Sequence, residues 1–109
     1  METAKKKVRL YVSRDGKCPY RTWFESLNDV DAQARILKRL TRVEMGNLGA
    51  CNFVGEGVYE LKIDYGHGYR IYFGQEEGET IILLGGGIKK SQAADILRAR
   101  KYWADWRRR

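Results

Sequence analysis

The stretch VYELKIDYGHGYRIYF, residues 58–73, decides the fold because it is typical of a β-hairpin. Apolar and polar residues alternate on both sides of a short glycine-flanked break, and such alternation is the pattern of paired strands. The segment Tyr65-Gly66-His67-Gly68 supplies the glycines that a tight turn requires. We expect His67 to be structural or exposed in this turn.

Successive side chains on a strand point to opposite faces, so the hairpin has an apolar face and a polar face. The apolar face holds Tyr59, Leu61, Ile63, Tyr69, Ile71 and Phe73. The polar face holds Glu60, Lys62, Asp64, Arg70 and Tyr72. Two registers fit this division: Arg70 lies opposite Lys62, or it lies opposite Asp64 and diagonal to Lys62. Either register places the two cations within roughly 5 to 8 Å of each other, measured between Cβ atoms.

The polar face has two interpretations, and both stay open at this point. In the first, Glu60 and Asp64 neutralise the two cations, and the face is merely solvated. In the second, the two cations bind a phosphate of a partner, and Tyr72 is free to stack on a base or to donate a hydrogen bond. In either case we expect Arg70 to project from the hairpin without a core contact, because its sequence neighbours take the apolar face.

The segment GGGIKKSQ, residues 85–92, adds Lys89 and Lys90 directly before the last expected helix. Glycines let backbone N–H groups turn toward a ligand, and a helix N-terminus favours an anion. As a phosphate motif the segment is weak by itself, because it is not a P-loop. Together with the hairpin it predicts a basic groove built from separate segments.

The remaining elements follow from local patterns. We expect a strand over residues 8–13, helices over 19–27 and 30–45, a loop with a short strand over 47–55, a strand over 80–87 and a last helix over 91–106. Pro19 suits the first position of a helix. Either Asn28 or Asp29 can cap the second helix, and Gly46 ends it. The run TIILLGGG, residues 80–87, is typical of a strand that is buried on both faces.

The last helix carries an apolar stripe and completes the fold. Its N-cap is Ser91, and its core-facing residues recur at helical spacing, namely Ile96, Ala99, Trp103 and Trp106. This aromatic stripe is more typical of packing than of a binding platform. The order of elements predicts a small α+β fold with an antiparallel sheet, in a single domain over residues 1–109.

The second helix carries four cations on one side. Arg35, Lys38, Arg39 and Arg42 fall at positions i, i+3, i+4 and i+7, and this spacing stacks their side chains. Most helices have a solvated polar face, so the stripe has an ordinary explanation. Four like charges repel one another, however, and a contact with RNA would explain why they are gathered. Both explanations remain open.

Composition narrows the classes of partner and ligand. The chain has 109 residues with a net charge of +7, and its pI is 9.6, so nucleic acid is the first candidate partner, before an acidic protein and a membrane surface. Two cysteines and one histidine show no zinc spacing, and we expect no metal and no cofactor. No apolar run approaches the ~20 residues of a membrane span. The start of the chain lacks a signal-type apolar stretch, so we expect a cytoplasmic protein.

At this point two stretches show a family resemblance. VYELKIDYGHGYRIYF and LLGGGIKKSQAADILRAR closely resemble the RelE/ParE superfamily of bacterial toxins, above all its HigB-like branch of addiction-module killer proteins. The resemblance covers nearly the whole chain. It implies a two-helix hairpin on a twisted antiparallel sheet, with a last helix packed against it. It also implies a cognate antitoxin, which we expect to be a small helix-turn-helix protein encoded beside the toxin.

The resemblance also assigns roles to single residues. Arg70 matches an arginine that contacts the scissile phosphate in RelE-like toxins, and Lys62 matches a basic strand residue. Lys89 lies where such toxins place another phosphate-binding cation. Glu60 stands where some relatives have a second lysine. The tyrosine or histidine that some relatives carry on the last helix has no clear match here, and Asp95 falls near that position.

In RelE-like and HigB-like toxins the activity is metal-independent cleavage of messenger RNA on the ribosome, whereas ParE-like toxins inhibit DNA gyrase. The resemblance therefore implies a ribosome-dependent endoribonuclease in which Arg70 stabilises the phosphate. The general base is an open question, and the positions of Glu60, Lys62 and Tyr72 on the polar face make them the three candidates. The cations of the second helix and Lys90 would bind RNA. A gyrase-binding toxin without nuclease chemistry is the alternative, and a basic RNA-binding module that has lost activity is the third possibility.

Overall fold

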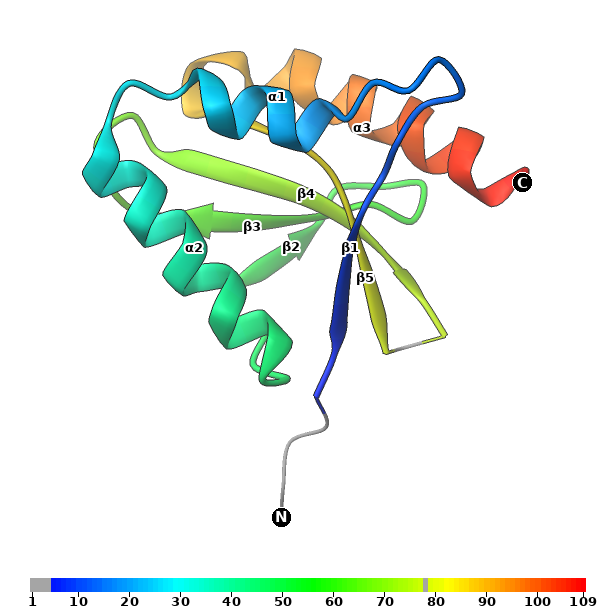
Figure 1. Cartoon of the computed structure of the whole chain (residues 1–109), viewed down its shortest axis with the longest axis horizontal. Helices are drawn as coiled ribbons and strands as arrows, with labels where there is room; N and C mark the ends of the chain where they lie inside the picture. Colours follow the sequence, from blue (N-terminus) through cyan, green and yellow to red (C-terminus); the bar gives the residue numbers. More distant parts are fainter. Residues whose placement is uncertain (1–4, 78) are drawn as a thin grey trace.

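The computed structural model describes residues 5–77 and 79–109 (Figure 1). The elements are β1 (Lys7–Leu10), α1 (Pro19–Ser26), α2 (Val30–Glu44), β2 (Cys51–Phe53), β3 (Tyr59–Ile63), β4 (Tyr69–Glu76), β5 (Thr80–Ile88), the short 3₁₀ turn η1 (Lys89–Ser91) and α3 (Gln92–Arg107). This order confirms the α+β fold with an N-terminal strand, two helices, a sheet and a C-terminal helix. Residues 1–4 and 78, which the expected domain of residues 1–109 includes, lie outside the described residues.

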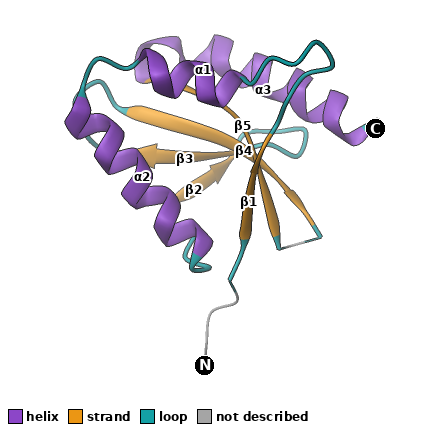
Figure 2. Ribbon diagram, in the orientation of Figure 1, coloured by secondary structure: helices purple, strands orange, loops and turns teal. Residues whose placement is uncertain are grey.

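The described strands form one twisted sheet in the order β1-β5-β4-β3-β2. Strands β2 to β5 pair antiparallel as predicted, whereas β1 pairs in parallel with β5. Parallel neighbours need a long crossover, and here two helices and three strands separate β1 from β5. β1 ends at Leu10, three residues before the predicted limit. Helices α1 and α2 cover one face of the sheet, and α3 covers the other (Figure 2).

The larger apolar core lies between the sheet and helices α1 and α2. It includes the apolar residues predicted for one face of the hairpin. Asp29 caps α2 by accepting a hydrogen bond from the Ala32 N–H at 3.0 Å, which decides between the two expected caps. Trp23 of α1 packs directly on β5. A Cβ atom at Gly86 would lie 2.2 Å from the Trp23 ring, so this close approach of helix and strand requires glycine.

The face under α3 holds a second core. Ala99 and Trp103 of α3 are buried against Val58, Ile82 and Leu84, which confirms that the stripe on this helix is used for packing. Because β5 contributes to both cores, its apolar run is buried on both faces as predicted. A helix and a strand also approach closely on this face. A Cβ atom at Gly74 of β4 would lie 2.5 Å from the Trp103 ring of α3.

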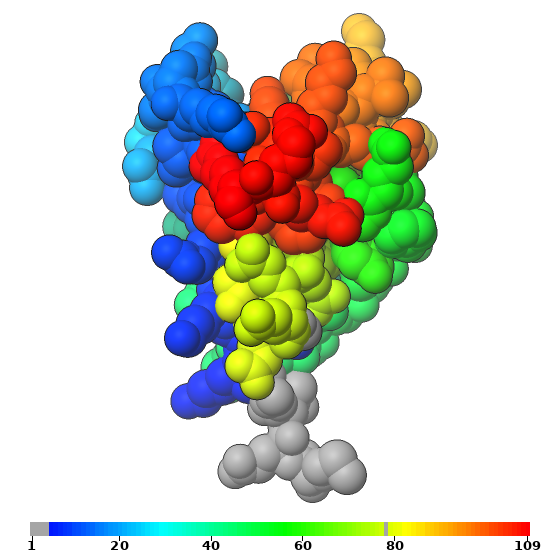
Figure 3. Space-filling view, turned by 90° about the vertical axis from the view of Figure 1, so that its right-hand side faces the viewer, coloured from blue at the N-terminus to red at the C-terminus, as the bar shows by residue number. Residues whose placement is uncertain are grey.

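The far end of α3 is fastened to the loop that follows β1, and the two segments lie side by side on the surface (Figure 3). The Tyr11 hydroxyl donates to Asp105 at 2.8 Å, and Arg109 Nη1 donates to the Val12 carbonyl at 2.8 Å. Arg14 Nε lies 3.4 Å from Asp105. Burial and the hydrogen bond to Asp105 raise the pKa of Tyr11 to about 12. These contacts hold the helix against the sheet at one end.

Candidate functional site

The hairpin adopts the first of the two expected registers. Lys62 of β3 lies directly opposite Arg70 of β4, and Gly87 of β5 lies on the other side of Arg70. The two cations are therefore neighbours, as both registers required.

Three of the five residues on the polar face of the hairpin are buried, which rules out the interpretation that this face is merely solvated. Helix α3 lies over it, and Glu60, Arg70 and Tyr72 are only 1%, 7% and 1% exposed. Lys62 and Asp64 remain exposed at the end of β3 and beyond it. The expectation that Arg70 projects without a core contact is therefore wrong, because a helix distant in sequence covers its side chain.

The buried guanidinium of Arg70 is held by two groups. Its Nη1 donates to the Gly68 carbonyl at 2.8 Å, and its Nε lies 3.6 Å from Glu60 Oε2. The same oxygen of Glu60 accepts a hydrogen bond from Gln92 Nε2 at 2.9 Å. The carboxylate therefore joins Arg70 to the first turn of α3. Sequence reasoning missed Gln92, and its position in the stretch LLGGGIKKSQAADILRAR was the available signal.

Tyr72 lies across the ladder from Glu60. Burial raises the pKa of the Tyr72 phenol, and the negative charges of Glu60 and Asp95 raise it further. Its hydroxyl has no hydrogen-bond partner among the residues that the structure describes. Near neutral pH the phenol therefore stays protonated, so it can donate a hydrogen bond but does not supply a phenolate base.

Asp95 extends this buried network along α3. It is 8% exposed, accepts a hydrogen bond from Ser91 Oγ at 2.5 Å and pairs with Arg98. A Cβ atom at Gly87 would lie 1.8 Å from Asp95 Oδ2, so only glycine fits there. Ser91 stands at the predicted N-cap position of α3, but its hydroxyl serves Asp95 rather than a helix N–H. The motif that suggested the family thus builds a buried polar network.

Lys89 meets Arg70 at the turn between β3 and β4. The Lys89 N–H donates to the His67 carbonyl at 3.3 Å. A Cβ atom at Gly68 would lie 3.3 Å from Arg70 Nη1 and 3.4 Å from Lys89 Cβ, so the two residues flank this glycine. Lys90 and His67 are exposed.

Helix α2 approaches the same turn from its other side. The guanidinium of Arg35 lies over the Tyr65 ring, 4.3 Å from its centroid. A cavity of about 380 Å³ between α2 and β3 is lined by Arg35, Lys38, Arg39, Arg42, Ala50, Lys62, Ile63 and Asp64. Lys62 thus lines a cavity that it shares with the cations of α2, and it lies opposite Arg70 on the neighbouring strand. The basic surface consists of the exposed cations around this turn, namely Arg35, Lys38, Arg42, Lys62, Lys89 and Lys90.

Arg39 does not belong to the basic surface, which corrects its place in the predicted RNA-binding stripe. It is 7% exposed, and its Nη2 donates to the carbonyls of Leu48 and Ala50. Burial lowers its pKa, and the neighbouring charge of Arg42 lowers it further. The side chain points from the helix to the loop before β2, so it fastens this loop instead of meeting a partner.

Two further observations concern metals and membranes. Within residues 5–77 and 79–109, no group of three or more His, Cys, Asp or Glu side chains is arranged to hold a metal ion. None of the helices in that part of the chain is long and apolar enough to cross a bilayer.

Comparison with known proteins assigns the family. Residues 22–102 match the family described as phage derived protein Gp49-like (DUF891). The chain is also similar to an uncharacterized protein of Haemophilus influenzae (strain ATCC 51907 / DSM 11121 / KW20 / Rd), at 40% identity over 79 residues, which is 72% of this chain and 80% of that protein. The match to the family runs from α1 into α3 and includes the hairpin and the buried network. The chain therefore belongs to the phage-derived Gp49-like family.

Proposed function

We propose that this Gp49-like protein is a HigB-like toxin of a toxin–antitoxin pair, and that it cleaves messenger RNA on the ribosome. The observation that best supports the proposal is the convergence of three cations at one turn. Arg70 and Lys89 flank Gly68, and Lys62 lies opposite Arg70 on the neighbouring strand. Cations from separate segments that meet beside a turn form a natural site for an RNA phosphate.

The chemistry assigned to this site is attack of the RNA 2′-hydroxyl on the adjacent phosphate. The reaction needs removal of the hydroxyl proton, stabilisation of negative charge on the phosphate oxygens and protonation of the leaving 5′-oxygen. Arg70 is the proposed stabiliser, because its fork of donors fits phosphate oxygens. Its anchoring by Glu60 and the Gly68 carbonyl orients the guanidinium before the substrate arrives, which is the condition for strong transition-state stabilisation.

The proposed roles of the other candidates follow from their surroundings. Glu60 is occupied by Arg70 and Gln92, so we assign it to positioning Arg70 instead of to proton transfer. Tyr72 stays protonated and can donate a hydrogen bond. Lys62 is exposed beside Arg70 and is the proposed general base, while Lys89 adds positive charge at the phosphate. The leaving 5′-oxygen takes its proton from water or from the ammonium that Lys62 becomes, and inefficient proton transfer suffices if the ribosome holds the message in an attacking geometry.

The proposed partners are the ribosome with its message and an antitoxin encoded beside the toxin, a small helix-turn-helix protein. Arg35, Lys38 and Arg42 of α2 would dock on ribosomal RNA, and Lys90 would contact the message. The proposed place of action is the cytoplasm, where these partners are found.

Expression of the chain alone in bacteria tests the proposal. We expect growth arrest and loss of intact message, and purified protein should cut a defined message only when ribosomes are present. Arg70→Ala should abolish both effects, whereas Arg39→Met, a change at an equally buried arginine, should preserve them. Growth arrest with intact message and reduced DNA supercoiling would instead indicate a gyrase-binding toxin. Normal growth with RNA binding alone would indicate a module without nuclease activity.

A further inference from the structure

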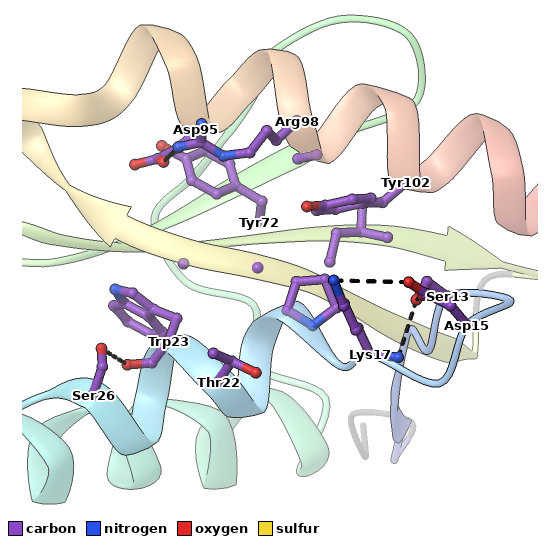
Figure 4. Close-up of a pocket in the computed structure, with 15 residues that line it drawn as sticks. Ser13, Asp15, Lys17, Thr22, Trp23, Ser26, Tyr72, Asp95, Arg98 and Tyr102 are labelled. Carbon is purple, nitrogen blue, oxygen red and sulfur yellow. Dashed lines mark hydrogen bonds and ion pairs between the residues drawn. The ribbon is translucent and has the colours of Figure 1, made fainter.

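A cleft between α1 and α3 adjoins the proposed site (Figure 4). Its volume is about 600 Å³. β1 pairs only with residues 80–83 of β5, so the second half of β5 is left for the two helices to flank. Gly85 and Gly86 line the cleft there. A Cβ atom at Gly85 would meet nothing within 4 Å, so the floor is open at Gly85, whereas the Trp23 ring covers it at Gly86.

The walls of the cleft combine flat aromatic surfaces with polar groups of both kinds. Trp23 stands at one end and Tyr102 at the other, while Asp95 and Arg98 of α3 lie along one side (Figure 4). The Asp95 carboxylate accepts hydrogen bonds, the Arg98 guanidinium donates them, and the Thr22 hydroxyl on α1 can do both. Aromatic faces with mixed donors and acceptors are the usual means of holding an unstacked nucleobase.

The charges of the cleft are internally balanced. Lys17 Nζ lies 3.8 Å from Asp15 Oδ2, and Arg98 is paired with Asp95. A neutral planar heterocycle suits such a cleft better than a phosphate does. The phosphate finds its cations outside the cleft, at Arg70 and Lys89.

The strand register connects the cleft to these cations. On β5, Gly87 pairs with Arg70, and Gly86 and Gly85 pair with the next two residues of β4. The floor of the cleft therefore begins one residue from the partner of Arg70. Asp95 lies against Gly87 and also lines the cleft. A nucleotide whose phosphate lies at Arg70 is thus within reach of the cleft through its own base or a neighbouring one.

We propose that the cleft between α1 and α3 binds one unpaired nucleobase of the message, stacked on Trp23. This inference rests on the proposed function and adds a base-binding site to its phosphate site. The base leaves the RNA stack, lies over Gly85 beside the Trp23 ring, and exchanges hydrogen bonds with Asp95, Arg98 or Thr22. The bases of the message beside the cut thereby influence where the protein cleaves.

Adenosine and inorganic phosphate, each titrated into isotope-labelled full-length protein and followed by NMR, test the two sites separately. Adenosine carries a base without a phosphate, so it should shift the amides of Gly85 and Gly86 and the indole N–H of Trp23. Phosphate should instead shift the amides around Gly68 and Lys89. Trp23→Leu should weaken adenosine binding about fivefold or more, because stacking on an aromatic ring is lost. Phosphate binding should not change.

Trp106→Leu is the matched control, because Trp106 is also partly buried but lies outside the cleft and donates to Glu76. It should leave adenosine affinity within twofold of the parent. The proposal is overturned if adenosine shifts only signals on α2, shifts none at all, or binds equally well to Trp23→Leu. The positions of the shifts in the unaltered protein decide the question even if Trp23→Leu does not fold.

Two other outcomes separate this inference from the proposed function. Phosphate binding and message cleavage without adenosine binding in the cleft would refute the base site and leave the nuclease proposal standing. If N-acetyltryptophanamide shifts the cleft signals and adenosine does not, the cleft accepts an aromatic side chain of a protein partner, and the base-binding proposal fails.

Discussion

Each face of the sheet buries one arginine, and the two arginines are treated differently. Arg39 on the side of α2 and Arg70 on the side of α3 are both 7% exposed. Arg39 donates to backbone carbonyls of the loop before β2, and no carboxylate pairs with it among the described residues. Arg70 lies beside the buried carboxylate of Glu60, which Gln92 of another element holds in place.

This difference shows that two equally buried arginines can have different surroundings. The guanidinium of Arg39 replaces missing backbone partners in a loop, which is a structural use. Arg70 is fixed by an oriented carboxylate and stands beside Lys89 at the edge of the basic surface. A cation held in one orientation next to other cations is suited to a phosphate. The tyrosines Tyr20 and Tyr72 form a second pair of this kind. They lie on opposite faces of the sheet, and each buries a hydroxyl without a hydrogen-bond partner among the described residues.

The largest effect is expected for Arg70→Ala. Cleavage of message on ribosomes should fall about a hundredfold or more, because one oriented donor to the developing negative charge is lost. The free energy of unfolding should also fall, by about 3 kcal/mol, because Glu60 is left buried without its cation. Single-turnover cleavage and urea denaturation measure the two effects.

Two controls accompany this prediction. Adding Glu60→Gln to Arg70→Ala should restore much of the stability but none of the cleavage. Arg70→Lys should rescue cleavage poorly, since an ammonium group cannot reproduce a two-pronged phosphate contact. If Arg70→Ala cleaves message at the rate of the parent protein, Arg70 has no role in cleavage and does not differ from Arg39 in this respect.

The next effect concerns the exposed cations of α2. Changing Arg35, Lys38 and Arg42 together to Gln should weaken ribosome binding and reduce the slope of log affinity against log salt by about two to three. Adding a change at Arg39 should not reduce the slope further, because this buried guanidinium meets no phosphate. A binding assay over a range of salt concentrations measures the slope. An unchanged slope in the triple variant would mean that these cations form only a solvated face.

Arg39→Met should have a smaller effect, and on stability alone. The free energy of unfolding should fall by about 1 to 2 kcal/mol, because the Leu48 and Ala50 carbonyls lose a charged donor. Cleavage should stay within twofold of the parent. Urea denaturation and the ribosome assay check both statements, and a well-folded Arg39→Met protein that no longer cleaves would contradict the structural role of this arginine.

The smallest effect is expected for the two buried tyrosines near neutral pH. Tyr20→Phe and Tyr72→Phe should each change the free energy of unfolding by less than about 1 kcal/mol, because neither hydroxyl has a hydrogen bond to lose. Only Tyr72→Phe should slow cleavage.

At high pH the free energy of unfolding of Tyr20→Phe should differ from that of the parent protein. Burial raises the pKa of Tyr20 to about 12, whereas a tyrosine in the unfolded chain titrates near ~10. The stability that the neutral phenol contributes is therefore complete below about pH 10 and is lost as the pH rises through 12. Denaturation at a series of pH values should show Tyr20→Phe losing less stability than the parent over this range. Parallel curves would contradict the raised pKa.

Much of the fold could be predicted from local patterns. The alternation in residues 58–73 predicts the two hairpin strands, their apolar face and a register with Lys62 opposite Arg70 as one of two choices. Helical spacing predicts α2 and the core stripe of α3, and the apolar run predicts that β5 is buried on both faces. These predictions succeed because strand and helix periods of 2 and 3.6 residues determine which side chains share a face, whatever the rest of the chain does.

Only the tertiary structure decided what covers each face. The polar face of the hairpin has the same alternation of residues whether it meets water or a helix. Its burial therefore depends on α3, which is distant in sequence and packs over it. The hydrogen bond from Gln92 to Glu60 joins residues 32 positions apart. Arg39 is buried next to the exposed Lys38 because its side chain faces the loop before β2. The cleft needs both α1 and α3 beside the glycines of β5. Periodicity is a local property of the chain, whereas burial depends on which distant element packs against it.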